Sequence, residues 1–128
     1  MIENIDAGTV LFLDIETVSA APTYDELGET MRELWTYKAP QAVRRPRAEM
    51  EEEDFRQAYD DRAGIFAEFG KIVCISVGVV FRSRDDQRLR LRLKSFASDD
   101  ERELLEGFSA MLQQYYKDPA KCYLCGHN

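Results

Sequence analysis

Two acidic residues two positions apart, Asp14 and Glu16, are the residues of this sequence best suited to chemistry. They follow the apolar run Thr-Val-Leu-Phe-Leu that starts at Thr9. Residues two apart in a strand point to the same face, roughly 7 Å apart at about 3.3 Å per residue. Ionised carboxylates beside an apolar interior need a positive partner, and no Lys or Arg occurs between Met1 and Met31. A divalent cation is therefore the expected partner, and oxygen ligands suit Mg²⁺ or Mn²⁺.

The same acids also fit a structural interpretation. Acidic residues at a strand end often begin a turn, so the segment from Asp14 to Thr17 is also consistent with a solvated exit from the sheet. Other catalytic patterns have less support. His127 is the only histidine, so any Ser-His or Cys-His mechanism would depend on it. The sequence contains no glycine-rich phosphate loop, and a phosphatase with an aspartyl nucleophile would have Asp where this chain has Glu16.

A second candidate ligand set lies near the C-terminal end, where Cys122, Cys125 and His127 combine residue types that bind zinc. Residues three apart in a strand point to opposite faces, and no second ligand pair occurs elsewhere, which disfavours this site. A zinc-structured adaptor stays open as an alternative. With Cys74 the cysteine count is odd, which is typical of reduced thiols rather than of a disulfide framework.

Composition limits the classes of protein. The 128 residues are 45% hydrophobic, enough for the core of one globular domain. The net charge of −7 argues against binding nucleic acid by overall charge, although bases gather in Arg44–Arg47 and in Arg82–Lys94. No apolar run approaches the roughly 20 residues that span a bilayer, and no signal-peptide pattern occurs. We therefore expect a cytoplasmic protein with no membrane partner.

The first half of the chain predicts one strand and two helices. The segment Thr9–Ile15 is almost continuously apolar, which predicts a central strand buried on both faces. Thr23 and Glu26 form a capping box that predicts a helix ending at Pro40, followed by a basic loop to Arg47. The apolar face of this helix contains Leu27, Met31, Leu34 and Trp35. A second helix is predicted from about Ala48, with Phe55, Ala58, Tyr59, Arg62 and Phe66 at helical spacing.

The second half predicts two strands, a helix and a final strand. Ile72–Phe81 is rich in β-branched residues, and a turn over Arg84–Gln87 would join it to the alternating segment Arg88–Lys94. That alternation predicts an edge strand with its leucines facing the core and its basic residues facing solvent. Ser98 and Glu101 form a second capping box, which opens a helix with the apolar stripe Leu104, Leu105, Phe108, Met111, Leu112 and Tyr115. Lys121–Cys125 indicates a short strand.

This order of elements predicts an α/β domain in which helices flank a mixed sheet. Within that frame, the segment Phe12-Leu-Asp-Ile-Glu-Thr-Val18 resembles the first exonuclease motif of the DEDD 3′–5′ exonucleases, a superfamily with an RNase H-like fold. Cys125-Gly-His-Asn128 resembles the opening of the second exonuclease motif. The segment Glu68–Ser76 is similar to the second strand of the branch related to the proofreading domain of family B DNA polymerases.

The resemblance implies a metal-dependent exonuclease that acts on single-stranded DNA or 3′ ends of DNA, with RNA left open. In such an enzyme Asp14 and Glu16 would be the catalytic carboxylates that hold two Mg²⁺ or Mn²⁺ ions. Thr17 would lie beside the terminal nucleotide, and Asn128 would help to position it. The two remaining family carboxylates would follow Asn128. We therefore expect residues 1–128 to be the N-terminal portion of a single RNase H-like domain, incomplete at its C-terminus and inactive alone.

A second hypothesis comes from a different class of protein. The chain would then be a nuclease-like module that has lost catalysis and serves in binding or assembly. The strand ending at Cys125 would lack its family neighbour, which leaves an open sheet edge and an uncovered apolar face. Self-association through that edge is therefore expected.

Overall fold

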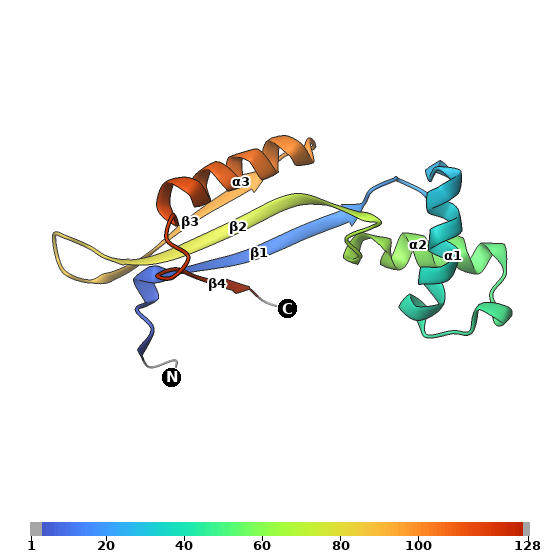
Figure 1. Ribbon diagram of the computed structural model, residues 1–128, viewed down its shortest axis with the longest axis horizontal. Helices are drawn as coiled ribbons and strands as arrows, with labels where there is room; N and C mark the ends of the chain where they lie inside the picture. The colour runs from blue at the N-terminus through green and yellow to red at the C-terminus, as the bar shows by residue number, and fades with distance from the viewer. Residues whose placement is uncertain (1–3, 127–128) are drawn as a thin grey trace. The chain divides into compact units, whose positions relative to one another are not determined.

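The computed structural model describes residues 4–126, and its elements follow the order that the sequence predicts (Figure 1). The strands and α-helices are β1 Val10–Ser19, α1 Glu29–Val43, α2 Glu52–Arg62, β2 Gly70–Arg82, β3 Leu89–Ala97, α3 Glu101–Tyr115 and β4 Tyr123–Gly126. Strand β1 pairs parallel with β4, whereas β2 pairs antiparallel with β3. The predicted α/β class, with a mixed four-stranded sheet and helices, is confirmed.

The central position predicted for β1 is confirmed, because the strand order is β3-β2-β1-β4. The predicted burial of β1 on both faces is wrong. Only Val10 and Leu11 of this strand are buried. Strand β4 pairs with β1 only as far as Leu13, and α3 packs on one face of the sheet, so most of β1 remains accessible within the described residues.

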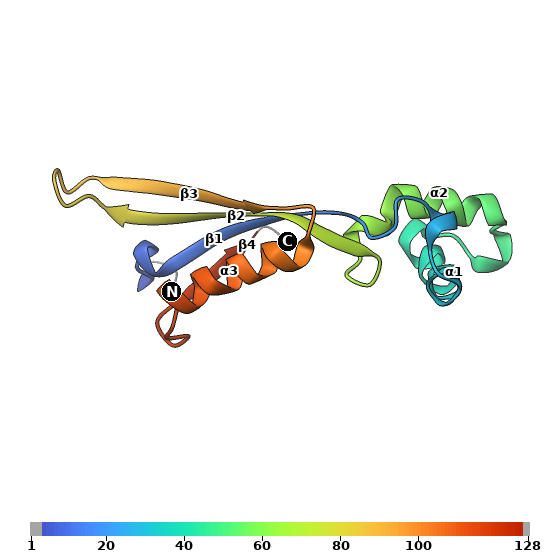
Figure 2. The same ribbon diagram turned by 90° about the horizontal axis from the view of Figure 1, so that it is seen from above.

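The chain divides into two compact units, one comprising residues 4–16 and 72–126 and the other residues 17–71. In the first unit α3 runs along one side of the sheet (Figure 2). Its core contains Leu11, Ile75, Val77 and Leu104, with Phe108 and Met111 packed against them. The side chain of Glu101 adds a polar connection between helix and sheet, because its Oε1 accepts a hydrogen bond from the Ile72 N–H at 2.6 Å.

The second unit is built around two aromatic side chains that are fully buried. The indole Nε1 of Trp35 donates to the Phe55 carbonyl at 2.9 Å, and the rings of Trp35 and Tyr59 meet edge to face at 5.4 Å. The Tyr59 hydroxyl accepts from the Ala21 N–H and donates to the Ala21 carbonyl. Buried polar atoms therefore have partners, which ties α1 and α2 to the segment before them.

Helix α1 differs from its prediction at both ends. Thr23 does donate to the Glu26 carboxylate at 2.9 Å, but this pair encloses a single 3₁₀ turn, and α1 begins at Glu29. The helix also continues past Pro40, which removes one N–H but leaves its own carbonyl free to accept from the Arg45 N–H at 3.0 Å. The predicted basic loop is therefore helical as far as Val43.

The predicted second and third helices are both present, but α2 is shorter than predicted at both ends, and α3 has a different cap. Helix α2 begins at Glu52, after a reciprocal capping box formed by Glu51 and Asp54. The Glu51 N–H, together with the Arg45 guanidinium at 2.7 Å, holds the pKa of Asp54 below its ordinary value. Helix α3 is capped by Asp100, two residues after the predicted Ser98, because the Asp100 carboxylate reaches the first free N–H groups of the helix.

Strand β3 is an edge strand as predicted, but the orientation predicted for its leucines is wrong. Leu89, Leu91 and Leu93 are 64%, 58% and 72% exposed. The register pairs Leu93 with Gly78 and Lys94 with Val77. Directly opposite residues share a face, so the basic residues of β3 lie on the side that α3 covers, and the leucines lie on the other side. We call the exposed apolar residues Phe12, Leu89, Leu91 and Leu93 the leucine face.

No helix within residues 4–126 combines the length and apolar character needed to cross a membrane.

Candidate functional site

Asp14 and Glu16 lie in the interior of β1, which continues three residues beyond Glu16 to Ser19. The interpretation of these acids as the end of the strand, or as a turn leaving the sheet, is therefore wrong. Their neighbours in β1 include Ile15, Thr17 and Val18, and such β-branched side chains favour the extended backbone. The backbone of β1 thus fixes both acids in a regular strand.

Both carboxylates point to the face of the sheet opposite α3. Leu11 and Leu13 pack in the core beneath α3, and side chains alternate along a strand, so Phe12, Asp14 and Glu16 share the other face. The close approach of Phe12 to Gly78, where an added Cβ would lie 3.9 Å from the Phe12 Cβ, places this side chain with the leucine face. Asp14 and Glu16 are both exposed, so a solvated ion can reach them.

The two carboxylates have few partners among the described residues. Asp14 Oδ1 accepts from the Ile15 N–H at 3.2 Å, and neither acid forms an ion pair with another residue of 4–126. That part of the chain also contains no cluster of three or more His, Cys, Asp or Glu side chains that could hold a metal ion. Two exposed carboxylates still fit Mg²⁺, because this ion commonly binds through one or two carboxylates and completes its shell with waters and phosphate oxygens.

The segment that resembles a second exonuclease motif lies beside the first. Strand β4 pairs parallel with β1, with Cys125 opposite Phe12 and Gly126 opposite Leu13. Gly126 is thus aligned with the residue that directly precedes Asp14. The predicted substrate residue Asn128 lies outside the described residues, as does His127.

Thr17 is exposed and follows Glu16 in β1. Successive side chains of a strand point to opposite faces, so the strand directs Thr17 away from the face that Asp14 and Glu16 share. Its contact with a terminal nucleotide stays a prediction.

The cysteines of the alternative zinc site are half-buried at Cys122 and exposed at Cys125, and both thiols are free. Cys125 lies in β4, whereas Cys122 precedes the strand. The third candidate ligand of this zinc site, His127, lies outside the described residues.

A groove that the sequence pattern did not indicate lies on the α3 side of the sheet. Arg92 and Lys94 line it, although the alternation in β3 had assigned them to solvent. This placement follows from β2, where Ile75 and Val77 are core residues and the antiparallel register places Phe96 and Lys94 opposite them.

Comparisons with protein-family models, with curated proteins and with solved structures find no match to this chain.

Proposed function

We propose that this chain forms part of a metal-dependent 3′–5′ exonuclease with an RNase H-like fold, which hydrolyses phosphodiester bonds at 3′ ends of DNA. The observation that carries the proposal is the placement of Asp14 and Glu16 on one accessible face of the central strand. The pairing of β4 with β1 adds support, because it aligns the segments that resemble two exonuclease motifs. The mixed sheet is compatible with an RNase H-like fold.

In this function Asp14 and Glu16 would hold Mg²⁺ or Mn²⁺. The ions would activate water and stabilise the leaving oxygen of the phosphodiester. The contribution of the protein is position and charge. Asp14 and Glu16 both lie within strand β1, so the backbone that carries the two carboxylates is part of the sheet rather than of a loop. Exposure would let the carboxylates share a cation with the phosphate of a nucleic acid end.

The test is the hydrolysis of a 3′-labelled single strand by the full-length natural protein in Mg²⁺. Asp14→Asn should lower the rate by about a hundredfold or more, since a lost metal ligand removes several kcal/mol of transition-state stabilisation. The matched control is Asp60→Asn, which neutralises an exposed acid of α2 and should leave the rate unchanged. Undiminished hydrolysis by a folded Asp14→Asn protein would contradict the proposal.

A second function is favoured by the leucine face. Phe12, Leu89, Leu91 and Leu93 together expose an apolar surface on the same side as the two acids. Exposed apolar patches of this kind mark protein interaction surfaces. The alternative proposal is therefore a nuclease-like module without catalysis that binds or assembles through this face.

A further inference from the structure

A groove in the first unit lies between the C-terminal half of α3 and the β2–β3 hairpin. Its volume is about 830 Å³, within the range of about 300 to 1,000 Å³ that is typical of ligand sites. The floor is apolar and contains Leu11, Val77, Val79 and Met111. Because Leu11 alternates with Phe12 and Asp14 along β1, the groove opens on the face of the sheet opposite the candidate metal site.

The charge of the groove is opposite to that of the whole chain. Its walls contain Arg92, Lys94, Lys117 and Lys121, against the single carboxylate of Asp118, whereas the chain has a net charge of −7. Lys121 pairs with Asp118 at 3.2 Å. Among residues 4–126, the other three cations have no acidic partner within ion-pair distance. Three cations are therefore available to an anion in this groove.

Aromatic rings lie beside two of these cations, and one of the rings, that of Phe81, belongs to the groove lining. The Arg92 guanidinium lies 5.0 Å from the centre of the Phe81 ring, and Lys94 Nζ lies 4.5 Å from the centre of the Phe96 ring. On the α3 side, Tyr115 also lines the groove and is 67% exposed. Such cation–π contacts hold each charge beside an apolar ring.

We propose that this groove binds a stretch of single-stranded nucleic acid. A single strand carries anionic phosphates and flat apolar bases, and the groove combines cations with aromatic side chains and an apolar floor. Phosphates would contact Arg92, Lys94 and Lys117, and a base would stack on Tyr115. A duplex does not fit this chemistry, because its base faces are stacked on one another. This inference goes beyond the proposed hydrolysis, since it concerns different residues on the other face of the sheet.

The test measures the anisotropy of a fluorescein-labelled oligothymidylate of about twelve nucleotides, with EDTA present so that hydrolysis plays no part. The wild-type chain should bind, with an affinity that falls as salt is raised. Arg92→Gln with Lys94→Gln should lower the slope of log K against log salt by about 1.4, because each phosphate contact on a single strand contributes about 0.7.

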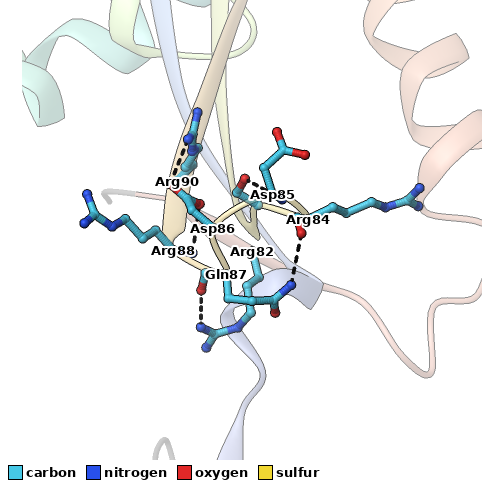
Figure 3. A network of polar contacts seen from close by, with 8 residues as sticks. Arg82, Arg84, Asp85, Asp86, Gln87, Arg88 and Arg90 are labelled. Carbon is cyan, nitrogen blue, oxygen red and sulfur yellow. Dashed lines mark hydrogen bonds and ion pairs between the residues drawn. The ribbon is translucent and has the colours of Figure 1, made fainter.

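The matched control uses two arginines of the hairpin turn, Arg84 and Arg88, which do not line the groove. Figure 3 shows their guanidinium groups extending away from the turn, whereas Arg82 contacts Gln87 and Arg90 contacts Asp86. Arg84→Gln with Arg88→Gln changes the net charge equally and should leave the slope unchanged. Equal slopes for both double variants would overturn the proposal, as would absence of binding by the wild type at low salt.

Stacking is tested separately. Tyr115→Leu keeps an apolar side chain but removes the ring, and should weaken binding roughly tenfold. Tyr37→Leu replaces a tyrosine of the second unit that is 57% exposed and lies outside the groove, and should have no effect. A base-free competitor, inorganic polyphosphate, should displace the oligonucleotide poorly at equal charge. Equal displacement, or an unchanged affinity of Tyr115→Leu, would show a plain cationic patch and would refute the proposal.

Discussion

The fold of the first unit depends little on the side chains of Asp14 and Glu16. Both are exposed, and neither forms an ion pair with another described residue. Surface substitutions of this kind usually change the free energy of unfolding by less than about 0.5 kcal/mol. Variants of these two acids should therefore stay folded, which makes a loss of activity or metal binding interpretable.

Two glycines of β2 test the packing at the residue scale. At Gly70 an added Cβ would lie 2.5 Å from the Gly64 carbonyl oxygen and 3.1 Å from that of Phe66, and these backbone atoms cannot move independently. At Gly78 the nearest atom is the Leu93 Cδ2, at 3.0 Å, and this exposed side chain can rotate away. Gly70→Ala should therefore lower the free energy of unfolding by about 1 to 3 kcal/mol.

The matched substitution Gly78→Ala should change stability by less than about 1 kcal/mol, because alanine also lowers the entropy of the unfolded chain. Urea unfolding of the two variants gives the comparison. Equal stability of the Gly70 and Gly78 variants would show that the turn from Gly64 to Gly70 is packed less tightly than described.

At the scale of elements, local signals predicted which helices exist better than where they begin. The apolar spacing of α3 was sufficient to predict that helix, because Leu104 and its neighbours recur on one side. Its cap was misassigned because Ser98, Asp99 and Asp100 are all good capping residues, and only the path of the backbone selects Asp100. The hydrogen bond of the predicted Thr23 capping box likewise forms, but it encloses only a single 3₁₀ turn rather than the start of α1.

Strand β3 shows the limit of sequence patterns more clearly. Its strict alternation correctly separated the leucines from the basic residues. Period-two alternation does not reveal which face a helix will cover, because that choice is made by β2 and α3 through tertiary packing. The groove on the α3 side could not be predicted for the same reason.

We predict that the chain associates with itself through the leucine face. Leu91 and Leu93 lie side by side over Gly78, and burying such a face against a partner removes apolar surface from water. The wild-type chain should sediment as a dimer or larger species at high protein concentration, and Leu91→Glu with Leu93→Glu should sediment as a monomer. In the control, Leu34→Glu with Ile65→Glu changes two exposed apolar residues of the second unit and should not alter association.

Sedimentation velocity over a range of concentrations separates these cases. A wild-type chain that remains monomeric throughout would argue against the assembly function. Association that persists unchanged in the Leu91 and Leu93 double variant would place the interface elsewhere, for example along the open edge of β4.

Across the described residues of the first unit, the two faces of the sheet differ in the kinds of side chain that they expose. The face with Asp14, Glu16 and the leucines is acidic and apolar, whereas the α3 side contains a groove with a basic wall. A chain with a net charge of −7 can therefore still present a local basic surface. The sequence predicted the mixed sheet, but it placed the two acids at the end of β1 rather than in its interior, and the division between the faces required the register of β2 and β3.

Mn²⁺ binding to this chain tests the proposal that Asp14 and Glu16 share a divalent cation. Isothermal titration with Mn²⁺ should show saturable binding to the wild type. Asp14→Asn and Glu16→Gln should each weaken Mn²⁺ binding roughly tenfold or more. Loss of a residue that only supports a ligand already has an effect of this size, and loss of the ligand itself should cost at least as much. Asp60→Asn should bind Mn²⁺ as the wild type does. Wild-type affinity for Mn²⁺ in both site variants, or no saturable Mn²⁺ binding by the wild-type chain, would contradict a cation site shared by Asp14 and Glu16.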